Sequence, residues 1–249
     1  MTLSDRATSF GEVAEEYDRW RPSYPAAAVD WLAPAAPARV ADVGAGTGKL
    51  TELLLARGLE VDSVEPDERM LGVLGRNNPA ARRHHSSSSR IPVEDGALDA
   101  VLVADAWHWF DPGPTIREVR RVLKPGGWLG LVWNVAAEPI YAWERVLADD
   151  SDEYDRKSKA SAEGLNTRLS YFDREELEFK QLEWAWRVTP HHFASFLATT
   201  SMAIALTPDD RTASFEASRS KLQQFCEAQG RQAIPLRHIA SCIRWTPKS

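Results

Sequence analysis

Hydrophobic positions early in the chain follow two periods in succession. The run from Val40 to Val43 is short, apolar and partly β-branched, as expected for a strand. A turn with three glycines follows, and then Leu50, Leu53 and Leu54 recur at the spacing of one helix face up to Gly58. A strand that leads into a glycine turn and a helix favours cofactor binding, because a ligand can lie against bare backbone and meet free N–H groups there.

The same use of periodicity and turn residues predicts the remaining elements. Helices are expected over residues 10–20, 26–32, 49–57, 116–123 and 140–147, from Pro190, and from Pro208 to about Gly230; strands are expected over residues 60–64, 98–104, 128–133, 180–188 and 239–245. Residues 124–127 read as a turn, residues 82–89 as a flexible serine-rich loop, and residues 148–166 as a polar surface excursion.

Spacing within the glycine turn separates the ligands that such turns hold. Gly48 and Lys49 are followed by Leu50, so the Gly-Lys-Ser/Thr ending of a phosphate-binding P-loop is absent. The dinucleotide fingerprint Gly-x-Gly-x-x-Gly is not met either, because Gly44, Gly46 and Gly48 stand at alternate positions. Asp42 comes two residues before the first glycine.

With this acid and the Gly-x-Gly-x-Gly turn, the chain resembles the class I S-adenosylmethionine-dependent methyltransferases. A second motif shared with this family is Lys124-Pro125-Gly126-Gly127 before an apolar strand. The resemblance covers about residues 10–135. It implies an α/β, Rossmann-like, doubly wound, mostly parallel sheet of seven strands whose last strand is antiparallel. It also implies a helical cap (residues 1–36), a cofactor-binding core (residues 37–135), and a completing part with helical insertions that shape the acceptor pocket (residues 136–249).

The resemblance implies that S-adenosylmethionine is the cofactor. Its contacts are expected at Tyr17, Arg21, Asp42, Gly44, Ala45, Gly46, Gly48, Glu65, Pro66, Met70, Ser87, Ser88, Ala104, Asp105 and Trp107. Glu65 closes the second strand 17 residues beyond Gly48, close to where an acid meets a ribose hydroxyl pair in nucleotide-binding βαβ units. Met70 is equally well explained as a core residue at helical spacing.

The N-terminal aromatic segment has two interpretations. By the resemblance, Tyr17 and Tyr24 line the cofactor pocket and Arg21 meets the methionyl carboxylate, which suits a planar guanidinium. Alternatively, this is an amphipathic helix that packs its aromatic residues on the core.

The Ser86–Ser89 segment departs from the family pattern. Related sequences usually carry an acid just before the Ile-Pro pair seen here at Ile91 and Pro92, and that acid receives the adenine amino group. A serine hydroxyl accepts the same hydrogen bond without a charge. Three outcomes are open: adenine is bound less strongly, it is bound through backbone atoms, or the loop has a different conformation from that of the family.

Residues 105–112 form an aromatic cluster at the carboxyl end of the expected strand 98–104, where ligands of open α/β sheets bind. Aromatic faces there would stabilise the positive charge of a sulfonium. Alternatively, these rings only pack against the end of the sheet. His108 is the candidate general base, and a structural role is its alternative. The other histidines show no metal-ligand spacing, so no metal is expected. Trp184, Trp186 and Phe196 are candidate acceptor contacts or core residues.

Composition narrows the class of partner. The 249 residues carry a net charge of −6 without a sustained basic block, which disfavours nucleic acid. No apolar run approaches membrane-spanning length, and the two cysteines show no Cys-x-x-Cys spacing, so a cytoplasmic protein is expected. The resemblance implies transfer of a methyl group to a small-molecule acceptor. An NAD-dependent oxidoreductase, a nucleic-acid methyltransferase and a binding protein without turnover are the alternatives; monomer and homodimer both stay open.

Overall fold

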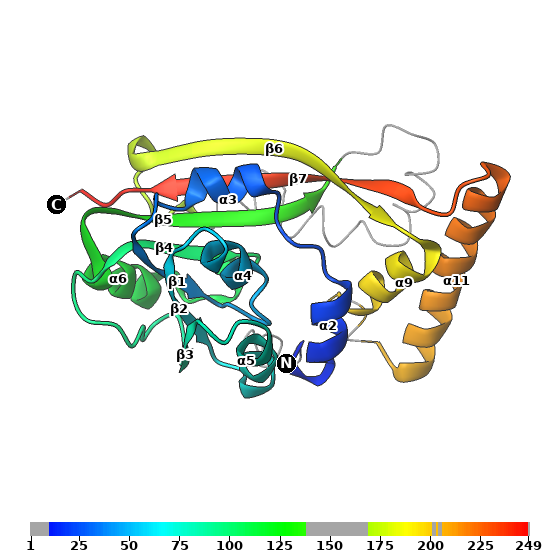
Figure 1. Ribbon diagram of the computed structural model, residues 1–249, viewed down its shortest axis with the longest axis horizontal. Coiled ribbons are helices and arrows are strands. Elements are labelled where there is room, and N and C mark those ends of the chain that lie inside the picture. The colour runs from blue at the N-terminus through cyan, green and yellow to red at the C-terminus, as the bar shows by residue number, and fades with distance from the viewer. Residues whose placement is uncertain (1–9, 138–168, 201–202, 204–205, 249) are drawn as a thin grey trace.

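A single twisted sheet with helices on both faces organises the chain (Figure 1). The computed structural model describes residues 10–137, 169–200, 203 and 206–248. The strands are β1 (Arg39–Val43), β2 (Glu60–Glu65), β3 (Arg82–His85), β4 (Leu98–Ala104), β5 (Leu123–Ala136), β6 (Leu177–Val188) and β7 (Ile234–Trp245). The helices are α2 (Ala14–Trp20), α3 (Ala26–Leu32), α4 (Lys49–Leu55), α5 (Glu68–Asn77), α6 (Pro112–Val122), α9 (Pro190–Ala198) and α11 (Pro208–Ala228), with 3-10 turns η1 (Phe10–Val13), η2 (Trp107–Trp109) and η3 (Arg174–Glu176).

The strand order is β3-β2-β1-β4-β5-β7-β6. β1 to β5 pair in parallel, and β7 is antiparallel to both of its neighbours, β5 and β6. This confirms the expected seven-stranded, Rossmann-like sheet with an antiparallel last strand. β1 and β4 are adjacent although the chain continues from β1 to β2, so the order reverses beside β1. Ligands of open α/β sheets bind at such a reversal, outside the carboxyl ends of the strands.

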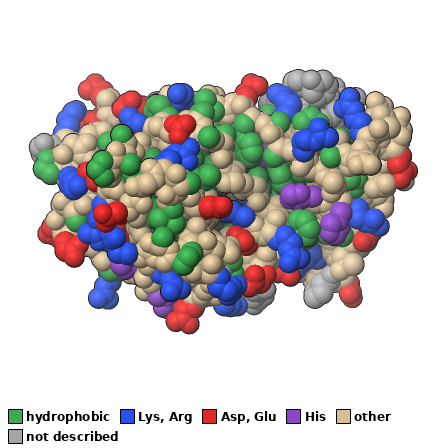
Figure 2. All heavy atoms as spheres, viewed as in Figure 1, with side chains coloured by type: hydrophobic (Ala, Val, Ile, Leu, Met, Phe, Trp, Pro, Cys, Tyr) green, Lys and Arg blue, Asp and Glu red, His purple; other side chains and the backbone are tan. Residues whose placement is uncertain are grey.

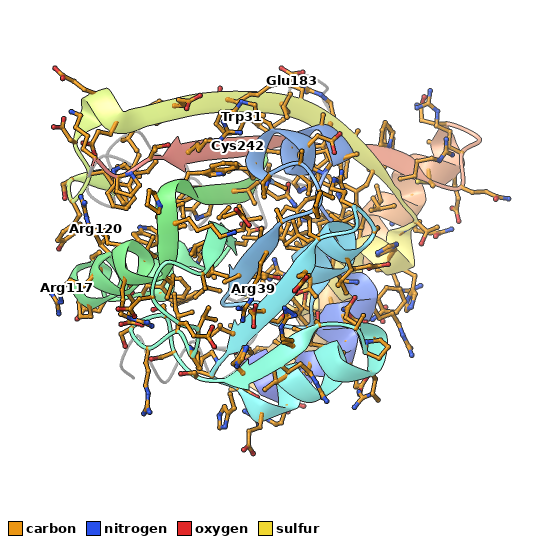
Figure 3. All side chains as sticks on the ribbon, turned by 60° about the vertical axis from the view of Figure 1, so that its left-hand side comes forward. Trp31, Arg39, Arg117, Arg120, Glu183 and Cys242 are labelled. Carbon is orange, nitrogen blue, oxygen red and sulfur yellow. The ribbon has the colours of Figure 1, made fainter. Side chains whose placement is uncertain are left out.

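Two apolar layers hold the sheet. One face packs under α6 through residues such as Val119 and Val122, and the other packs under α3 and α4. Trp31 of α3 lies over this second face beside Cys242 of β7 (Figure 3). Strands β1 and β4 are therefore covered on both sides, which explains their continuous apolar sequences.

β6 and β7 run past the end of β5, and we call this extension the overhang (residues 185–188 and 234–237). In Figure 1 it reaches α9 and α11, which pack on it around a small core of Val188, Phe193, Leu222, Cys226 and Ile234. Thr189 caps α9 by accepting the backbone N–H of His192, and proline occupies the first helical position, as predicted.

Several elements differ from the sequence prediction: α5 was not predicted, and α6 and β6 begin before the expected residues 116 and 180. Three further differences lie in β3, β5 and β7. β3 occupies residues 82–85, which were expected to be loop, because an edge strand with exposed side chains needs no apolar residues. β5 begins at Leu123 and continues through the expected turn, with a register shift opposite Leu98 and Ala100. β7 begins at Ile234 and not at Ile239, because its first residues pair with β6 alone.

Two other expectations, the helix over 140–147 and the excursion over 148–166, lie outside the described residues. In the described part of the chain, no helix combines the length and the apolar character needed to cross a bilayer.

Candidate active site

The glycine turn after β1 is tied to the end of β2. The backbone N–H groups of Gly44 and Ala45 donate to the carbonyl of Val64 at 2.8 and 3.2 Å. All three glycines have positive φ, which an L side chain rarely adopts. A Cβ on Gly44 would meet the Ala106 and Phe110 side chains.

The middle glycine differs from its neighbours. A Cβ on Gly48 would press on the Asn78 and Leu74 side chains, whereas a Cβ on Gly46 would have no described atom within 4 Å. The outer glycines are therefore required by packing, and Gly46 borders open space. A cofactor can approach the backbone of the turn at this one position.

Asp42 lies directly beneath the turn and is almost fully buried. Its Oδ2 accepts the Thr51 hydroxyl at 2.7 Å, and that hydroxyl also lies 2.9 Å from the Ser63 hydroxyl. Its Oδ1 is buried without a hydrogen-bond partner in the described structure. Burial raises the pKa of Asp42 from 3.8 to about 7, and the Thr51 hydrogen bond partly opposes that rise. An unused acceptor beneath an open turn fits a ligand that brings a donor.

Glu65 closes β2 and faces the turn. Its two carboxylate oxygens each accept a backbone N–H at 2.9 Å, one from Gly46 and one from Asp67. The side chain is only 7% exposed, and this burial raises its pKa to about 6 although the two N–H bonds lower it. The acid and the open glycine predicted from sequence are therefore brought into direct contact.

The raised pKa of Asp42 makes stability depend on pH. Because the folded state holds this proton more tightly than the unfolded state, its contribution is fully present below about pH 4 and is lost as pH rises through about 7. Asp42→Asn removes this loss. Between pH 5 and pH 8, we expect the difference in unfolding free energy, Asp42→Asn minus wild type, to increase by ~1–3 kcal/mol. A pKa shift of this size sets an upper limit of ~4 kcal/mol on that increase. Denaturant titrations across this range measure it, and parallel profiles would contradict it.

Asp105 follows β4, and its carboxylate links this strand to β5 and to the segment between α2 and α3. Its φ is +50°, the one positive value among the described non-glycine residues, so the backbone is held in a conformation that L residues disfavour. Its carboxylate accepts the Tyr24 hydroxyl at 3.1 Å and the backbone N–H of Asn134 at 3.3 Å. Burial, and then the Asp105 carboxylate, raise the pKa of Tyr24, so this phenol stays protonated and donates.

The N-terminal helix α2 lies over the same region. Burial raises the pKa of Tyr17, with Arg21, Asp105 and Glu65 as the charges that act on it, so this ring lies among three predicted site residues. The Arg21 guanidinium donates to Thr199 after α9 at 3.0 and 2.8 Å, and it lies over the rings of Tyr17 and Phe196. In this structure Arg21 is therefore bound to α9, and its expected carboxylate contact stays a prediction.

The serine segment extends β3 beside Glu65. The backbone N–H of Ser86 donates to the Glu65 carbonyl at 3.3 Å. The Ser87 hydroxyl lies 3.0 Å from that of Ser89, and the Ser88 hydroxyl lies 2.9 Å from that of Thr115. These two predicted contacts thus bond to other protein hydroxyls, and Ser86 is the serine attached to Glu65.

Five other predicted residues lie partly beside the site and partly in the core. Ala104 ends β4, and the Pro66 carbonyl lies 2.8 Å from His85 Nε2. Trp107 is buried in the core against Phe172, and Met70 is buried with Ala14 and Val73. Core packing therefore accounts for the position of both side chains. His108 lies on η2 with its ring 4.6 Å from that of Trp109, in the segment that Asp105 begins.

Sequence reasoning missed Asn134, Ser23 and Thr51. The Asn134 side-chain N–H donates to the Ser23 carbonyl at 3.1 Å, which ties the N-terminal segment to β5. A signal was available, because Asn134 is the first polar residue after an apolar strand, as Asp105 is after β4. No sequence signal indicated Thr51, because the pattern of a helix does not show which carboxylate one of its hydroxyl groups will contact.

Together, the reversed strand order, the open glycine turn and the carboxylate bonded to it define a Rossmann-like nucleotide-cofactor-binding protein. Residues 41–131 match the family described as a methyltransferase domain. An uncharacterized methyltransferase of Mycobacterium tuberculosis is 39% identical over 252 residues, covering 99% of both chains. An uncharacterized methyltransferase-like protein of Schizosaccharomyces pombe is 36% identical over 136 residues, about half of each chain (53%).

Solved structures show the same fold. A structure from Anaeromyxobacter dehalogenans, assigned as a type II methyltransferase, aligns with a TM-score of 0.67 at 26% identity, covering 90% of this chain and 96% of that one. A phosphoethanolamine N-methyltransferase of Haemonchus contortus, in complex with phosphomonomethylethanolamine and S-adenosylhomocysteine, aligns with a TM-score of 0.56 at 16% identity, covering 99% of this chain and 59% of that one. The chain belongs to the class I S-adenosylmethionine-dependent methyltransferase family.

Proposed function

We propose that this protein binds S-adenosylmethionine between the glycine turn and Glu65 and transfers its methyl group to a small-molecule acceptor. The observation that carries the proposal is the open face of Gly46 beside the Glu65 carboxylate. Gly46 offers backbone to the amino-acid part of the cofactor, Asp42 offers an unused carboxylate oxygen beneath it, and Glu65 accepts from two adjacent ribose hydroxyls.

When bound, the cofactor supplies a sulfonium methyl group, which accepts a lone pair from an oxygen, nitrogen or carbon of the acceptor as the carbon–sulfur bond electrons return to sulfur. Tyr17, Tyr24 and α2 cover the site and exclude water. Asp105 and Asn134 fix the carboxyl ends of β4 and β5 relative to each other. Positioning two reactants in this way can contribute ~7–11 kcal/mol to lowering a barrier, so no catalytic triad is required.

Calorimetry with S-adenosylhomocysteine and with NAD tests the cofactor. We expect the first to bind and the second not to. Binding of NAD alone would instead support the oxidoreductase. Transfer of a radiolabelled methyl group to a member of a small-molecule library separates an enzyme from a binding protein, and tight cofactor binding without any transfer would favour the latter.

His108 is proposed as the base that takes the proton released by an oxygen or nitrogen acceptor. A general base acts only when it is deprotonated, so activity that depends on one falls about tenfold for each pH unit below the pKa of that base. We expect His108→Ala to flatten this acidic limb of the kcat profile, while His85→Ala, an exposed histidine on β3, leaves it in place. An unaltered limb in His108→Ala would assign that ring to packing.

Within the proposal, residues 1–36 cover the cofactor, residues 37–135 hold it, and residues 136–249 complete the sheet and bound the acceptor site. A cytoplasmic location and the absence of nucleic-acid and membrane partners stay predictions. Cys226 and Cys242 are buried and form no disulfide, which is compatible with a reducing compartment.

A further inference from the structure

A group of buried polar atoms without partners lies on one face of the sheet, beyond the cofactor residues. The group comprises Ser23 Oγ, Asn134 Oδ1, Trp184 Nε1 and Trp186 Nε1, and we call it the polar floor. None of the four atoms has a hydrogen-bond partner among the described residues, and none is accessible to solvent. Leaving such an atom unpaired costs ~1–3 kcal/mol, so four together are a departure that needs a cause.

Strand register places these atoms together. Asn134 pairs with Ala240 and Trp184 pairs with His238, while Trp186 follows Trp184 by two residues on β6. Since side chains alternate along strands, these residues share the face that α3 covers at one end and α9 at the other. Glu183, the residue before Trp184, is on the exposed outer side of β6 (Figure 3). The segment after α2 crosses this face, because the Ser23 carbonyl accepts the Asn134 side chain.

Aromatic rings border the polar floor. The Trp186 ring lies 4.8 Å from that of His192, 5.6 Å from that of Phe196 and 6.2 Å from that of His238, and the Trp184 ring lies 5.6 Å from that of His238. Figure 2 shows histidine side chains at the surface over α9, which carries His192. Burial lowers the pKa of His192, so the ring of this residue is neutral at physiological pH.

The polar floor adjoins the cofactor residues through Asp105. The same carboxylate accepts from Tyr24, beside the covered cofactor site, and from the backbone of Asn134 in the polar floor. Asp105 thus links the polar floor to the residues beside the proposed cofactor site.

We propose that the polar floor is the methyl-acceptor site, and that it takes a flat aromatic molecule whose oxygen atoms accept hydrogen bonds from the Trp184 and Trp186 indoles. This inference rests on the proposed function. The walls suit a planar ring, because aromatic pairs are favoured at centroid distances of ~4.5–7 Å. The two indoles are donors only, so they select a ligand oxygen that accepts, while Ser23 and Asn134 can receive its hydroxyl.

The test uses the indole N–H signals of the protein labelled with ¹⁵N-tryptophan and saturated with S-adenosylhomocysteine. Titration with 4-hydroxybenzoate and with quercetin is expected to move the Trp184 and Trp186 signals downfield. The Trp128 and Trp245 indoles already donate to Leu32 and Glu176 and should stay in place. Cyclohexanecarboxylate, which has the carboxylate but no flat ring, should leave all four unmoved.

Trp184→Phe and Trp186→Phe keep a ring and remove the donor. Each is expected to weaken 4-hydroxybenzoate binding about three- to tenfold, with Trp128→Phe as the matched control that leaves it unchanged. Trp186 lies in the overhang, so its variant carries the test if Trp184→Phe does not fold. Indole signals that ignore both aromatic probes, or that respond equally to cyclohexanecarboxylate, would overturn the inference.

A separate measurement distinguishes the two proposals. If S-adenosylhomocysteine does not bind the wild-type protein, the proposed function fails, and the same titration without it still judges the polar floor. If S-adenosylhomocysteine binds but the indoles do not respond, the polar floor alone is refuted.

Discussion

Glu65→Ala is expected to weaken S-adenosylhomocysteine binding by ~3–6 kcal/mol, which is more than a hundredfold. A carboxylate that accepts two ribose hydroxyls loses two hydrogen bonds to a charged group, each contributing ~1.5–3 kcal/mol. The structure already shows both oxygens of Glu65 accepting N–H groups at 2.9 Å, so the carboxylate is held at the turn before any ligand arrives. Calorimetry measures the change.

The controls separate binding from folding. Glu68→Ala removes an exposed carboxylate three residues away and should leave affinity unchanged. Glu65→Gln keeps the shape without the charge and should fall between the wild type and Glu65→Ala. Thermal melting identifies any loss of the folded state, because the alanine variant leaves two N–H groups without their acceptor. Wild-type affinity in a folded Glu65→Ala would remove the ribose role.

Substitution of Gly46 is expected to block the cofactor while the fold survives. An alanine methyl group there enters space that no described residue fills, so it meets the ligand, at a cost of ~1–3 kcal/mol in affinity. Valine extends further and should abolish measurable binding. Calorimetry on the two variants gives the graded loss.

Gly96 is the matched control for strain. Its φ of +63° is close to the +55° of Gly46, and a Cβ there also meets no described atom within 4 Å. Gly96→Ala therefore carries the same backbone penalty away from the turn, and should lower the melting temperature as Gly46→Ala does without changing affinity. Equal affinities in the two variants would show that no ligand approaches Gly46.

The sequence predicted the cofactor half of the fold closely, because its elements carry local signals. The α3 helix and the β4 strand occur with the expected bounds, since a proline before the helix and a doubly covered strand leave clear patterns. β3 was missed because an edge strand of two arginines and two histidines owes its form to its pairing with β2, which no local pattern records.

The candidate site also contains residues that carry a local sequence signal and residues that only the fold brings together. Gly46 and Glu65 were singled out by their spacing in the sequence, and the structure brings them into hydrogen-bond contact. The polar floor could not be found as a group, because Ser23, Asn134 and Trp186 are far apart in sequence and meet only through the register of β5, β6 and β7. Arg21 was given a ligand role from its motif, whereas its bonds to Thr199 depend on where α9 folds back.

The overhang has a consequence for how such a protein diversifies. α9 and α11 pack there around a core of their own, apart from the strands that carry the glycine turn. On the proposed function, mutations in α9 and α11 would alter which acceptor is bound while the strands that carry the glycine turn stay unchanged. In that case acceptor choice would evolve with few changes to the cofactor-binding strands, and the bonds from Arg21 to Thr199 would be the contacts to preserve.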